Sequence, residues 1–147
     1  MSTLLGIAVK SAKFAPMRAE EQGQLNTETG LLGDWRGKPG KRQITVLALT
    51  DWQTACAELG IERPWTDRRA NLLLADVPKI PGSRIALGEA VLEVTGECDP
   101  CERMQAVHPG LFDALAKDWR GGVTCRVLQG GEIFLNMPAI FEVPTDV

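Results

Sequence analysis

The residues most able to do chemistry stand in one short segment, Cys98-Asp99-Pro100-Cys101-Glu102-Arg103-Met104. A cysteine thiolate attacks electrophiles, carries sulfur and binds soft metals. We expect a strand over residues 91–95 to enter the segment and a helix to leave it, and a helix N-terminus favours the thiolate form of a cysteine. Arg103, two residues after Cys101, would add positive charge. The pattern indicates a reactive thiol at Cys101.

Four interpretations of the two cysteines remain open at this point. Both thiols can be buried packing residues, as free cysteines often are. Cys98 and Cys101 have the spacing of half a zinc site, which His108 and Cys125 would complete. A CxxC pair where a strand meets a helix also fits a dithiol redox switch, although the flanking βαβ pattern is missing. In the fourth interpretation Cys101 works alone, as a metal ligand or a sulfur carrier.

The other reactive residue types give weaker signals. His108 is the one histidine of the chain and precedes Pro109-Gly110, where a surface or capping role is more common than catalysis. The sequence has no Gly-x-Ser-x-Gly elbow, no Walker A motif and no Gly-x-Gly-x-x-Gly loop. These motifs therefore give no support to a serine hydrolase or a P-loop enzyme.

Arginines recur beside turn residues, in segments that could together line an anion site. A guanidinium presents a planar fork suited to phosphate or carboxylate, and turn glycines let backbone amides approach such a group. Any one of these arginines alone is more often a solvated turn residue. The segments are Gly33-Asp34-Trp35-Arg36, Arg68-Arg69-Ala70-Asn71 and Arg120-Gly121-Gly122, with Arg42 and Arg103 nearby in other turns.

Length and composition limit the class of protein. A chain of 147 residues predicts a single domain over 1–147, with a core large enough to fold without disulfides or metals. The net charge of −3, without a basic run longer than two residues, argues against nucleic acid as a partner. We find neither a stretch of about 20 apolar residues nor a signal-peptide pattern. We therefore expect no membrane span, a cytoplasmic location and reduced thiols.

Short strands must position the chemical residues. We expect about seven or eight, drawn from residues 3–9, 22–27, 43–49, 71–74, 85–87, 91–94, 123–128, 132–135 and 140–143. Hairpins are expected across Gly88-Glu89 and across Gly130-Gly131. Strands do not alternate with helices in the βαβ manner, so we expect a mainly β fold. A closed or nearly closed barrel would hide that many strand edges.

Three short helices are expected as insertions, over residues 50–59, 101–107 and 111–119. The first has the strongest pattern, because Thr50-Asp51-Trp52-Gln53 has the form of a capping box and Gly60 that of a C-cap. Cys56 falls on the apolar face of that helix and should lie in the core.

Taken in order, these pieces resemble the MOSC domain, a family named for the C-terminal domain of molybdenum cofactor sulfurases. The resemblance covers about residues 5–135. The matching pieces are Gly30-Leu31-Leu32-Gly33-Asp34, Lys41-Arg42-Gln43-Ile44-Thr45, Arg69-Ala70-Asn71-Leu72, Gly88, the segment from Cys98 to Met104, and Arg120-Gly121-Gly122-Val123.

The resemblance implies a MOSC-type β-barrel with a few inserted helices, and it assigns the hallmark cysteine to Cys101 rather than Cys98. In relatives that reduce N-hydroxylated compounds, that thiolate is a ligand of molybdenum in the pterin cofactor. Cys101 is accordingly our candidate for both the catalytic residue and the metal ligand. Candidate contacts for the cofactor's phosphate or pterin are Arg36, Arg42, Arg69, Asn71 and Arg120, with Arg103 as the neighbour of Cys101.

Two functions follow as expectations. The first is a molybdenum-cofactor-binding oxidoreductase acting on small N-hydroxylated compounds, with an electron-transfer partner because the chain shows no flavin, haem or iron–sulfur pattern. The second is a sulfur carrier without catalysis of its own, in which Cys101 receives a persulfide from a cysteine desulfurase for cofactor or metal–sulfur cluster assembly. A chain this small also suggests an oligomer in which a second subunit completes the pocket.

Overall fold

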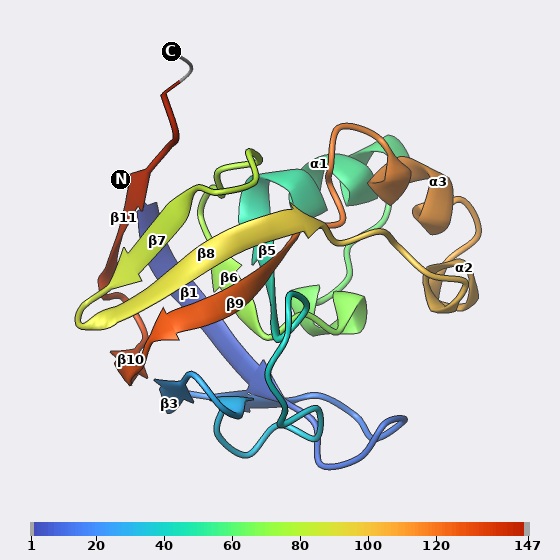
Figure 1. Cartoon of the computed structure of the whole chain (residues 1–147). Coiled ribbons are helices and arrows are strands. Elements are labelled where there is room, and N and C mark those ends of the chain that lie inside the picture. Colours follow the sequence, from blue (N-terminus) through green and yellow to red (C-terminus); the bar gives the residue numbers. More distant parts are fainter. Residues whose placement is uncertain (1, 146–147) are drawn as a thin grey trace.

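The computed structural model describes residues 2–145 and places a barrel of strands beside a layer of short helices (Figure 1). The strands are β1 (Ser2–Val9), β2 (Arg18–Glu20), β3 (Gln22–Asn26), β4 (Gly30–Leu31), β5 (Ile44–Ala48), β6 (Leu72–Leu74), β7 (Arg84–Leu87), β8 (Ala90–Glu97), β9 (Val123–Gln129), β10 (Gly131–Phe134) and β11 (Pro138–Glu142). The helices are α1 (Leu49–Glu58), the 3-10 helix η1 (Trp65–Arg68), α2 (Arg103–Val107) and α3 (Leu111–Ala116). The predicted mainly β fold with short inserted helices is confirmed.

Seven of the strands described in residues 2–145 close into a barrel. Their order around the ring is β11-β7-β8-β9-β5-β6-β1, and β11 pairs with β1 to complete it. The closing register joins Ser2 to Ala139 and Thr3 to Pro138. Closure pairs both edges of the sheet, which is the reason for expecting a barrel from so many short strands.

A second, small sheet contains β10, β3 and β4, and it corrects one prediction. The hairpin expected across Gly130-Gly131 is wrong, because β10 pairs with β3 and not with β9. A Cβ on Gly130 would lie 2.5 Å from the carbonyl oxygen of Leu25, and one on Gly131 would lie 2.9 Å from the amide nitrogen of Ala90. The glycine pair thus permits a close crossing of backbones instead of a two-residue turn.

The other predicted hairpin is confirmed and carries the chain toward the candidate site. In it, β7 and β8 pair antiparallel, with Leu87 opposite Ala90. Gly88 turns the chain with φ of +64°, in the left-handed region that glycine adopts without steric cost. From this turn β8 runs the length of the barrel toward α2 (Figure 1).

Two apolar clusters stabilise the molecule. The first fills the barrel with residues such as Leu4, Leu74 and Leu92, all fully buried. The second packs α1, α2 and α3 against the outside of the barrel, through Trp52, Met104 and Leu111 among others. Because side chains fill the barrel, a ligand must bind outside it. No helix within residues 2–145 has the length and apolar character needed to cross a membrane.

The start of α1 differs from the prediction. The helix begins at Leu49, with Ala48 as its N-cap, and no side chain caps it. Thr50 therefore lies inside the first turn, where its hydroxyl donates to the Ala75 carbonyl at 3.4 Å. The predicted capping box is wrong because the helix starts one residue early. At the other end Gly60 follows the last turn with φ of +66°, as its pattern predicts.

Candidate functional site

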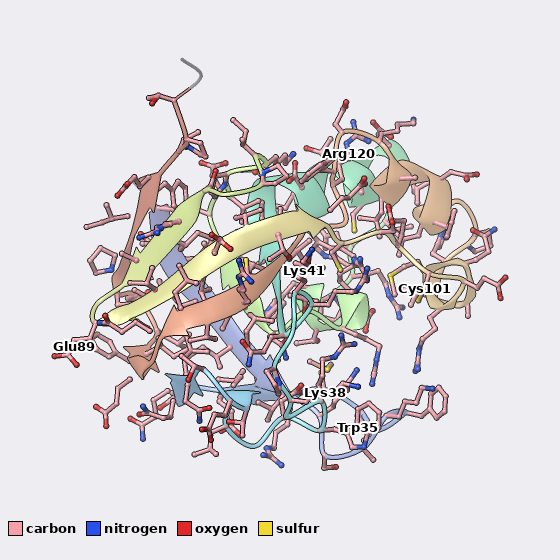
Figure 2. All side chains as sticks on the ribbon, in the orientation of Figure 1. Trp35, Lys38, Lys41, Glu89, Cys101 and Arg120 are labelled. Carbon is pink, nitrogen blue, oxygen red and sulfur yellow. The ribbon has the colours of Figure 1, made fainter. Side chains whose placement is uncertain are left out.

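Cys101 lies outside the barrel, in the connection between β8 and α2 (Figure 2). It is the exposed one of the four cysteines, whereas Cys56, Cys98 and Cys125 are buried. The amide of Cys98 donates to the Gly122 carbonyl at 2.9 Å, which fixes the beginning of the connection on β9. The Cys101 carbonyl accepts from the Met104 amide at 2.9 Å, and α2 begins at Arg103 with Glu102 as its N-cap, so Cys101 lies just before the helix and not at its first residue as predicted.

A buried guanidinium holds this connection in place. Arg68, at the end of η1, is 6% exposed and reaches under the loop. Its Nε donates to the Gly121 carbonyl at 2.9 Å. Its Nη2 donates to the carbonyls of Cys98 and Asp99, at 2.9 and 3.2 Å, and lies 3.4 Å from the Cys98 sulfur. Charge-assisted hydrogen bonds of this kind are strong when buried, so Arg68 defines the course of the loop that presents Cys101.

Gly121 is required by the same arrangement. A Cβ at this position would lie 2.6 Å from the Cys98 carbonyl oxygen and 3.2 Å from Arg68 Nη2. The loop therefore packs directly on the backbone of the Arg120-Gly121-Gly122 segment. This contact explains why the glycines matter, independently of the arginine that precedes them.

A pocket of about 310 Å³ opens beside Cys101. We call it the thiol pocket. Half of its lining residues are cationic, and an acidic residue, Asp99, also lines it. The lining consists of Lys10, Lys13, Phe14, Trp35, Arg36, Arg42, Thr45, Arg68, Arg69, Cys98, Asp99, Cys101, Arg103 and Met104.

The cations of the thiol pocket lack carboxylate partners. Within residues 2–145 none of the seven forms an ion pair, whereas Arg18, Arg63, Arg120 and Arg126 all do. Burial, and then the neighbouring Arg69 guanidinium, lower the pKa of Lys10, against the opposing effect of Asp34. Burial and Arg103 likewise lower the pKa of Arg69, while Cys101 and Asp34 oppose this. Burial is the first cause of both shifts, and the contributions of Arg69 and Arg103 come from neighbouring positive charges that a bound anion would relieve.

One side of the pocket is formed by residues 10–17, which follow β1. Arg69 donates through Nη2 to the Ala15 carbonyl at 2.6 Å and so ties this segment down. Arg69 itself has φ of +67°, a left-handed conformation that is uncommon for a side chain of its size. The Arg103 guanidinium lies 5.2 Å from the centre of the Phe14 ring, a cation–π contact. Phe14 is 72% exposed, so its ring stands at the rim of the pocket.

The connection between β4 and β5 also lines the pocket, next to Lys10. The Trp35 amide donates to the Lys10 carbonyl at 2.7 Å, and the Lys10 amide donates to Asp34 Oδ1 at 3.0 Å. Arg36 donates through Nη1 to the Arg42 carbonyl at 3.0 Å. These bonds fix a loop rich in cations against β1 and leave Trp35 half exposed at the rim (Figure 2).

The structure gathers some of the predicted site residues and separates others. Cys101, Arg36, Arg42, Arg69 and Arg103 all line the thiol pocket. The two other candidates, Asn71 and Arg120, are not among its lining residues.

Asn71 is buried behind the pocket. Its Oδ1 accepts from the Thr45 amide at 3.1 Å and its Nδ2 donates to the Ala8 carbonyl at 3.3 Å. It therefore connects β5 to β1 and holds Thr45, which lines the pocket. Arg120 pairs with Glu58 at 2.9 Å and donates to the Ala114 carbonyl at 3.2 Å, near α1 and α3 (Figure 2).

Sequence reasoning did not single out Lys10 and Lys13, and it gave Arg68 no role of its own. The two lysines carry no motif, since they follow β1 in a loop of mixed composition. They reach Cys101 only because β1 and β8 end near each other in the barrel. For Arg68 a signal existed, because it precedes Arg69 in a segment already taken as anion-binding.

The zinc interpretation finds no support in this arrangement. Among the described residues there is no group of three or more His, Cys, Asp or Glu side chains placed to hold a metal ion. Cys125 lies inside the barrel, and burial, followed by the effects of Cys98 and Glu93, raises the pKa of its thiol. The ring of His108 contacts the Pro109 carbonyl at 2.7 Å. Of the proposed four ligands, only Cys98 and Cys101 line the thiol pocket.

Chemically, the site combines an accessible thiol, guanidinium and ammonium groups that form no ion pair within residues 2–145, and two aromatic rings at the rim. Guanidinium groups bind phosphate and carboxylate oxygens. Aromatic faces stack on planar ligands. The site is therefore suited to a planar anion whose reactive atom lies near sulfur.

Comparison with known proteins supports the same conclusion about the fold. The family model of the MOSC domain matches residues 23–136. The YuaD protein from Bacillus subtilis has a similar structure, with a TM-score of 0.81 and 19% identity over 99% of this chain and 98% of that one. YiiM from Geobacillus stearothermophilus gives a TM-score of 0.78 and 17% identity, over 97% of this chain and 75% of that one. YiiM from Escherichia coli gives a TM-score of 0.69 and 13% identity, over 99% of this chain and 72% of that one. No curated protein sequence matches.

Proposed function

The chain belongs to the MOSC domain family, and on that premise we propose that it binds the molybdenum cofactor in the thiol pocket, with Cys101 as the metal ligand. The family is associated with this cofactor in general. The observation that carries the proposal for this chain is the set of seven pocket cations without an ion-pair partner in residues 2–145, next to an exposed thiol.

The residues of the pocket fit such a group. The pterin part of the cofactor is planar and ends in a phosphate, so it needs cationic donors and flat apolar surfaces. Arg36, Arg42 and Arg69 would hold the phosphate, with Lys10 beside them. The exposed rings of Phe14 and Trp35 would flank the pterin.

The cysteine sulfur is the donor that suits the metal. Soft thiolate ligands bind transition metals that carboxylates hold less well. Cys101 is accessible from the pocket and Arg103 follows it on α2, so positive charge lies beside the sulfur. Arg68 keeps the Cys101 loop rigid through its three backbone carbonyls, which would fix the position of the ligand.

We further propose that the protein, with the molybdenum cofactor bound, is an oxidoreductase acting on N-hydroxylated compounds. When bound, the cofactor would supply the two-electron reduction of an N-hydroxyl group to the amine and water, with two electrons from a partner protein and two protons from solvent. The chain itself would bind the substrate oxygen through Arg103 and limit the access of water with residues 10–17. An oligomer would close the open side of the pocket further.

Molybdenum content tests this function. The protein is purified without oxygen from cells that make the cofactor, together with Cys101→Ser, Arg69→Gln and the control Arg126→Gln, whose guanidinium pairs with Glu93 on the barrel. We expect molybdenum in the wild type and the control, little in Cys101→Ser, and at least tenfold less in Arg69→Gln. Normal molybdenum content in Cys101→Ser would remove the role of its sulfur. With reduced viologen as donor, the loaded wild type should consume an N-hydroxylated compound.

The exposure of Cys101 favours a second candidate function, that of a sulfur carrier for cofactor or metal–sulfur cluster assembly. A desulfurase must reach the accepting thiol, and Cys101 is the cysteine of this chain that a protein of that size can reach. The Cys101 thiolate would attack the outer sulfur of the enzyme's persulfide and take it over. The enzyme's own cysteine would be released as a thiolate. Incubation with a cysteine desulfurase and cysteine should then add one sulfur to the wild type and none to Cys101→Ser. An unchanged wild-type mass would argue against this function.

A further inference from the structure

We propose that the connection between β4 and β5 is a docking site for the acidic face of a partner protein. The connection covers residues 32–43 and contains four cations that line a depression of about 410 Å³. We call these four residues the docking cations: Arg36, Lys38, Lys41 and Arg42. Binding there would need neither the cofactor nor a reaction at the thiol, so it is a role additional to the proposed function.

Positive charge is concentrated at the docking cations and the adjoining thiol pocket. Together these two groups contain nine of the chain's 16 lysines and arginines, because Arg36 and Arg42 belong to both. Asp99 is the one carboxylate among residues 2–145 that lines the thiol pocket or the depression. In the rest of the sequence, seven cations stand against 18 of the 19 carboxylates. The net charge of −3 therefore combines a positive surface around the two pockets with a negative remainder.

The nine cations also differ from the others in their pairing. Within residues 2–145 none of them forms an ion pair, whereas six of the seven remaining cations do. Asp34, the carboxylate of the connection, instead accepts from the amides of Lys10 and Arg36, at 3.0 and 3.4 Å. A cofactor phosphate in the thiol pocket would carry about two negative charges, fewer than the cations gathered there. Lys38 and Lys41 are exposed outside that pocket, so positive charge remains to attract and steer an anionic partner.

Hydrogen bonds hold the connection in one conformation before a partner arrives. Thr95 of β8 donates through its hydroxyl to the Lys41 carbonyl. Gln43, which is buried, donates through Nε2 to the Thr27 carbonyl at 3.0 Å and accepts from the Val127 amide at 2.9 Å. Because these bonds fix the backbone that carries the docking cations, little conformational entropy would be lost on binding.

An exposed aromatic residue on the same connection favours a protein as the partner. Trp35 is 49% exposed and directly precedes Arg36. Tryptophan and arginine are enriched among the residues that carry most of the binding energy in protein interfaces. A nucleic acid or an anionic membrane presents negative charge over a long distance, and much of it would meet the negative remainder of this chain. The acidic face of a protein can match the limited area of the docking cations.

Docking at this place would bring the partner to the exposed thiol. Arg36 and Arg42 line both the depression and the thiol pocket, which contains Cys101. Lys38 and Lys41 lie along the connection in Figure 2. A protein bound there would therefore cover the edge of the thiol pocket.

Fluorescence anisotropy tests the docking site with the full chain as purified. The probe is a fluorescein-labelled peptide of glutamate and leucine, and its reference is the same peptide with glutamine in place of glutamate. We expect the wild type to bind the glutamate peptide more tightly than its reference, with an affinity that falls as salt is added. Changing Lys38 and Lys41 together to glutamine should weaken this binding by about fivefold, because two exposed charge pairs are lost.

The matched control changes Lys79 and Lys117 to glutamine. These lysines lie outside both pockets and pair with Asp51 and Glu58, so the control loses the same charge, and its affinity should change by less than about twofold. Equal losses in the two double variants would overturn the docking site, because net charge alone would then explain the binding. A wild type that does not bind the glutamate peptide would overturn it as well.

Two further measurements complete the test. Wild type that binds single-stranded RNA or phosphatidylserine vesicles more tightly than the peptide, through Lys38 and Lys41, would overturn the choice of a protein partner. The variant changed at Lys38 and Lys41 should hold as much molybdenum as the wild type, because neither lysine lines the thiol pocket. A loss of molybdenum in this variant would show that the two lysines belong to the cofactor site and would overturn a separate docking site.

Discussion

Cys125 lies on β9 and Cys101 follows β8, the strand that pairs with β9, yet the two thiols have opposite surroundings. Cys125 lies on β9 opposite Val94 of β8, inside the barrel, with no exposed surface. Cys101 lies beyond the end of β8, outside the barrel, where it is exposed among guanidinium groups. Burial raises the pKa of Cys125, so that thiol stays neutral and unreactive at ordinary pH.

The difference teaches that the barrel and its end loops have separate tasks in this molecule. The barrel interior is closed by aliphatic side chains and holds the strands in register. The loops that leave one end of it bring together residues from 10 to 103, which no single element could do. Cys98 stands between the two regions, buried like Cys125 but in contact with Arg68.

The largest predicted effect is on stability, when Arg68 and Arg69 are each changed to glutamine. Arg68→Gln removes the donors to three backbone carbonyls under the Cys101 loop, and we expect a loss of about 3 kcal/mol in the free energy of unfolding. Arg69→Gln changes a half-buried side chain at the pocket wall and should cost less than about 1 kcal/mol. Urea denaturation measures both values.

For phosphate binding the order of the two variants should be reversed, so that Arg69→Gln has the larger effect. Phosphate affinity should fall more than fivefold in Arg69→Gln, whose side chain faces the pocket. If Arg69→Gln instead proves the less stable protein, the division between a supporting and a binding arginine is wrong.

A smaller effect separates the two cysteines. Cys125→Ser places a hydroxyl in an apolar interior and should cost about 2 kcal/mol in unfolding free energy. Cys101→Ser exchanges an exposed thiol and should stay within about 0.5 kcal/mol of the wild type. Native alkylation with iodoacetamide should modify Cys101 first and leave Cys125 unmodified until the protein unfolds. Early modification of Cys125 would show that the barrel opens.

The sequence was sufficient for features set by local pattern. Short aliphatic runs located most strands, and Gly88-Glu89 located one hairpin, because a tight turn needs residues that tolerate its backbone angles. The family resemblance located Cys101 and the arginines that now line one pocket. The strands and the hairpin are properties that neighbouring residues determine among themselves, whereas the site residues came from the family resemblance.

Long-range pairing was beyond this kind of reasoning. Gly130-Gly131 has the pattern of a turn, but the glycines serve a crossing with Leu25, more than a hundred residues earlier in the chain. Lys10 lines the thiol pocket with Cys98 because β1 and β8, which the two residues follow, belong to the same barrel. Arg120 matched a family motif, yet its guanidinium pairs with Glu58 while the adjacent Gly121 supports the Cys98 loop.

The smallest predicted effect concerns pH and tests whether the pocket charges are crowded. Burial and Arg69 lower the pKa of Lys10 in the folded protein, whereas in the unfolded chain it keeps its ordinary value of 10.5. Between the two values the unfolded chain binds more protons, so this group makes the folded protein more stable as pH rises through that window. A bound phosphate favours the charged lysine and therefore opposes the shift, so the stabilisation by phosphate should decrease over the same window.

Urea denaturation at pH 8, 9 and 10, with and without phosphate, measures the effect of Lys10 through the variant Lys10→Gln. Relative to the wild type, Lys10→Gln should lose the rise in stability with pH, because it has no proton to release. In Lys10→Gln the stabilisation by phosphate should also no longer decrease as the pH rises. Lys117→Gln, an exposed lysine beside Glu58, should behave like the wild type. If Lys10→Gln and the wild type show the same pH slope, the positive charges of the thiol pocket are already compensated, and the contrast with the neutral barrel interior is weaker than the geometry indicates.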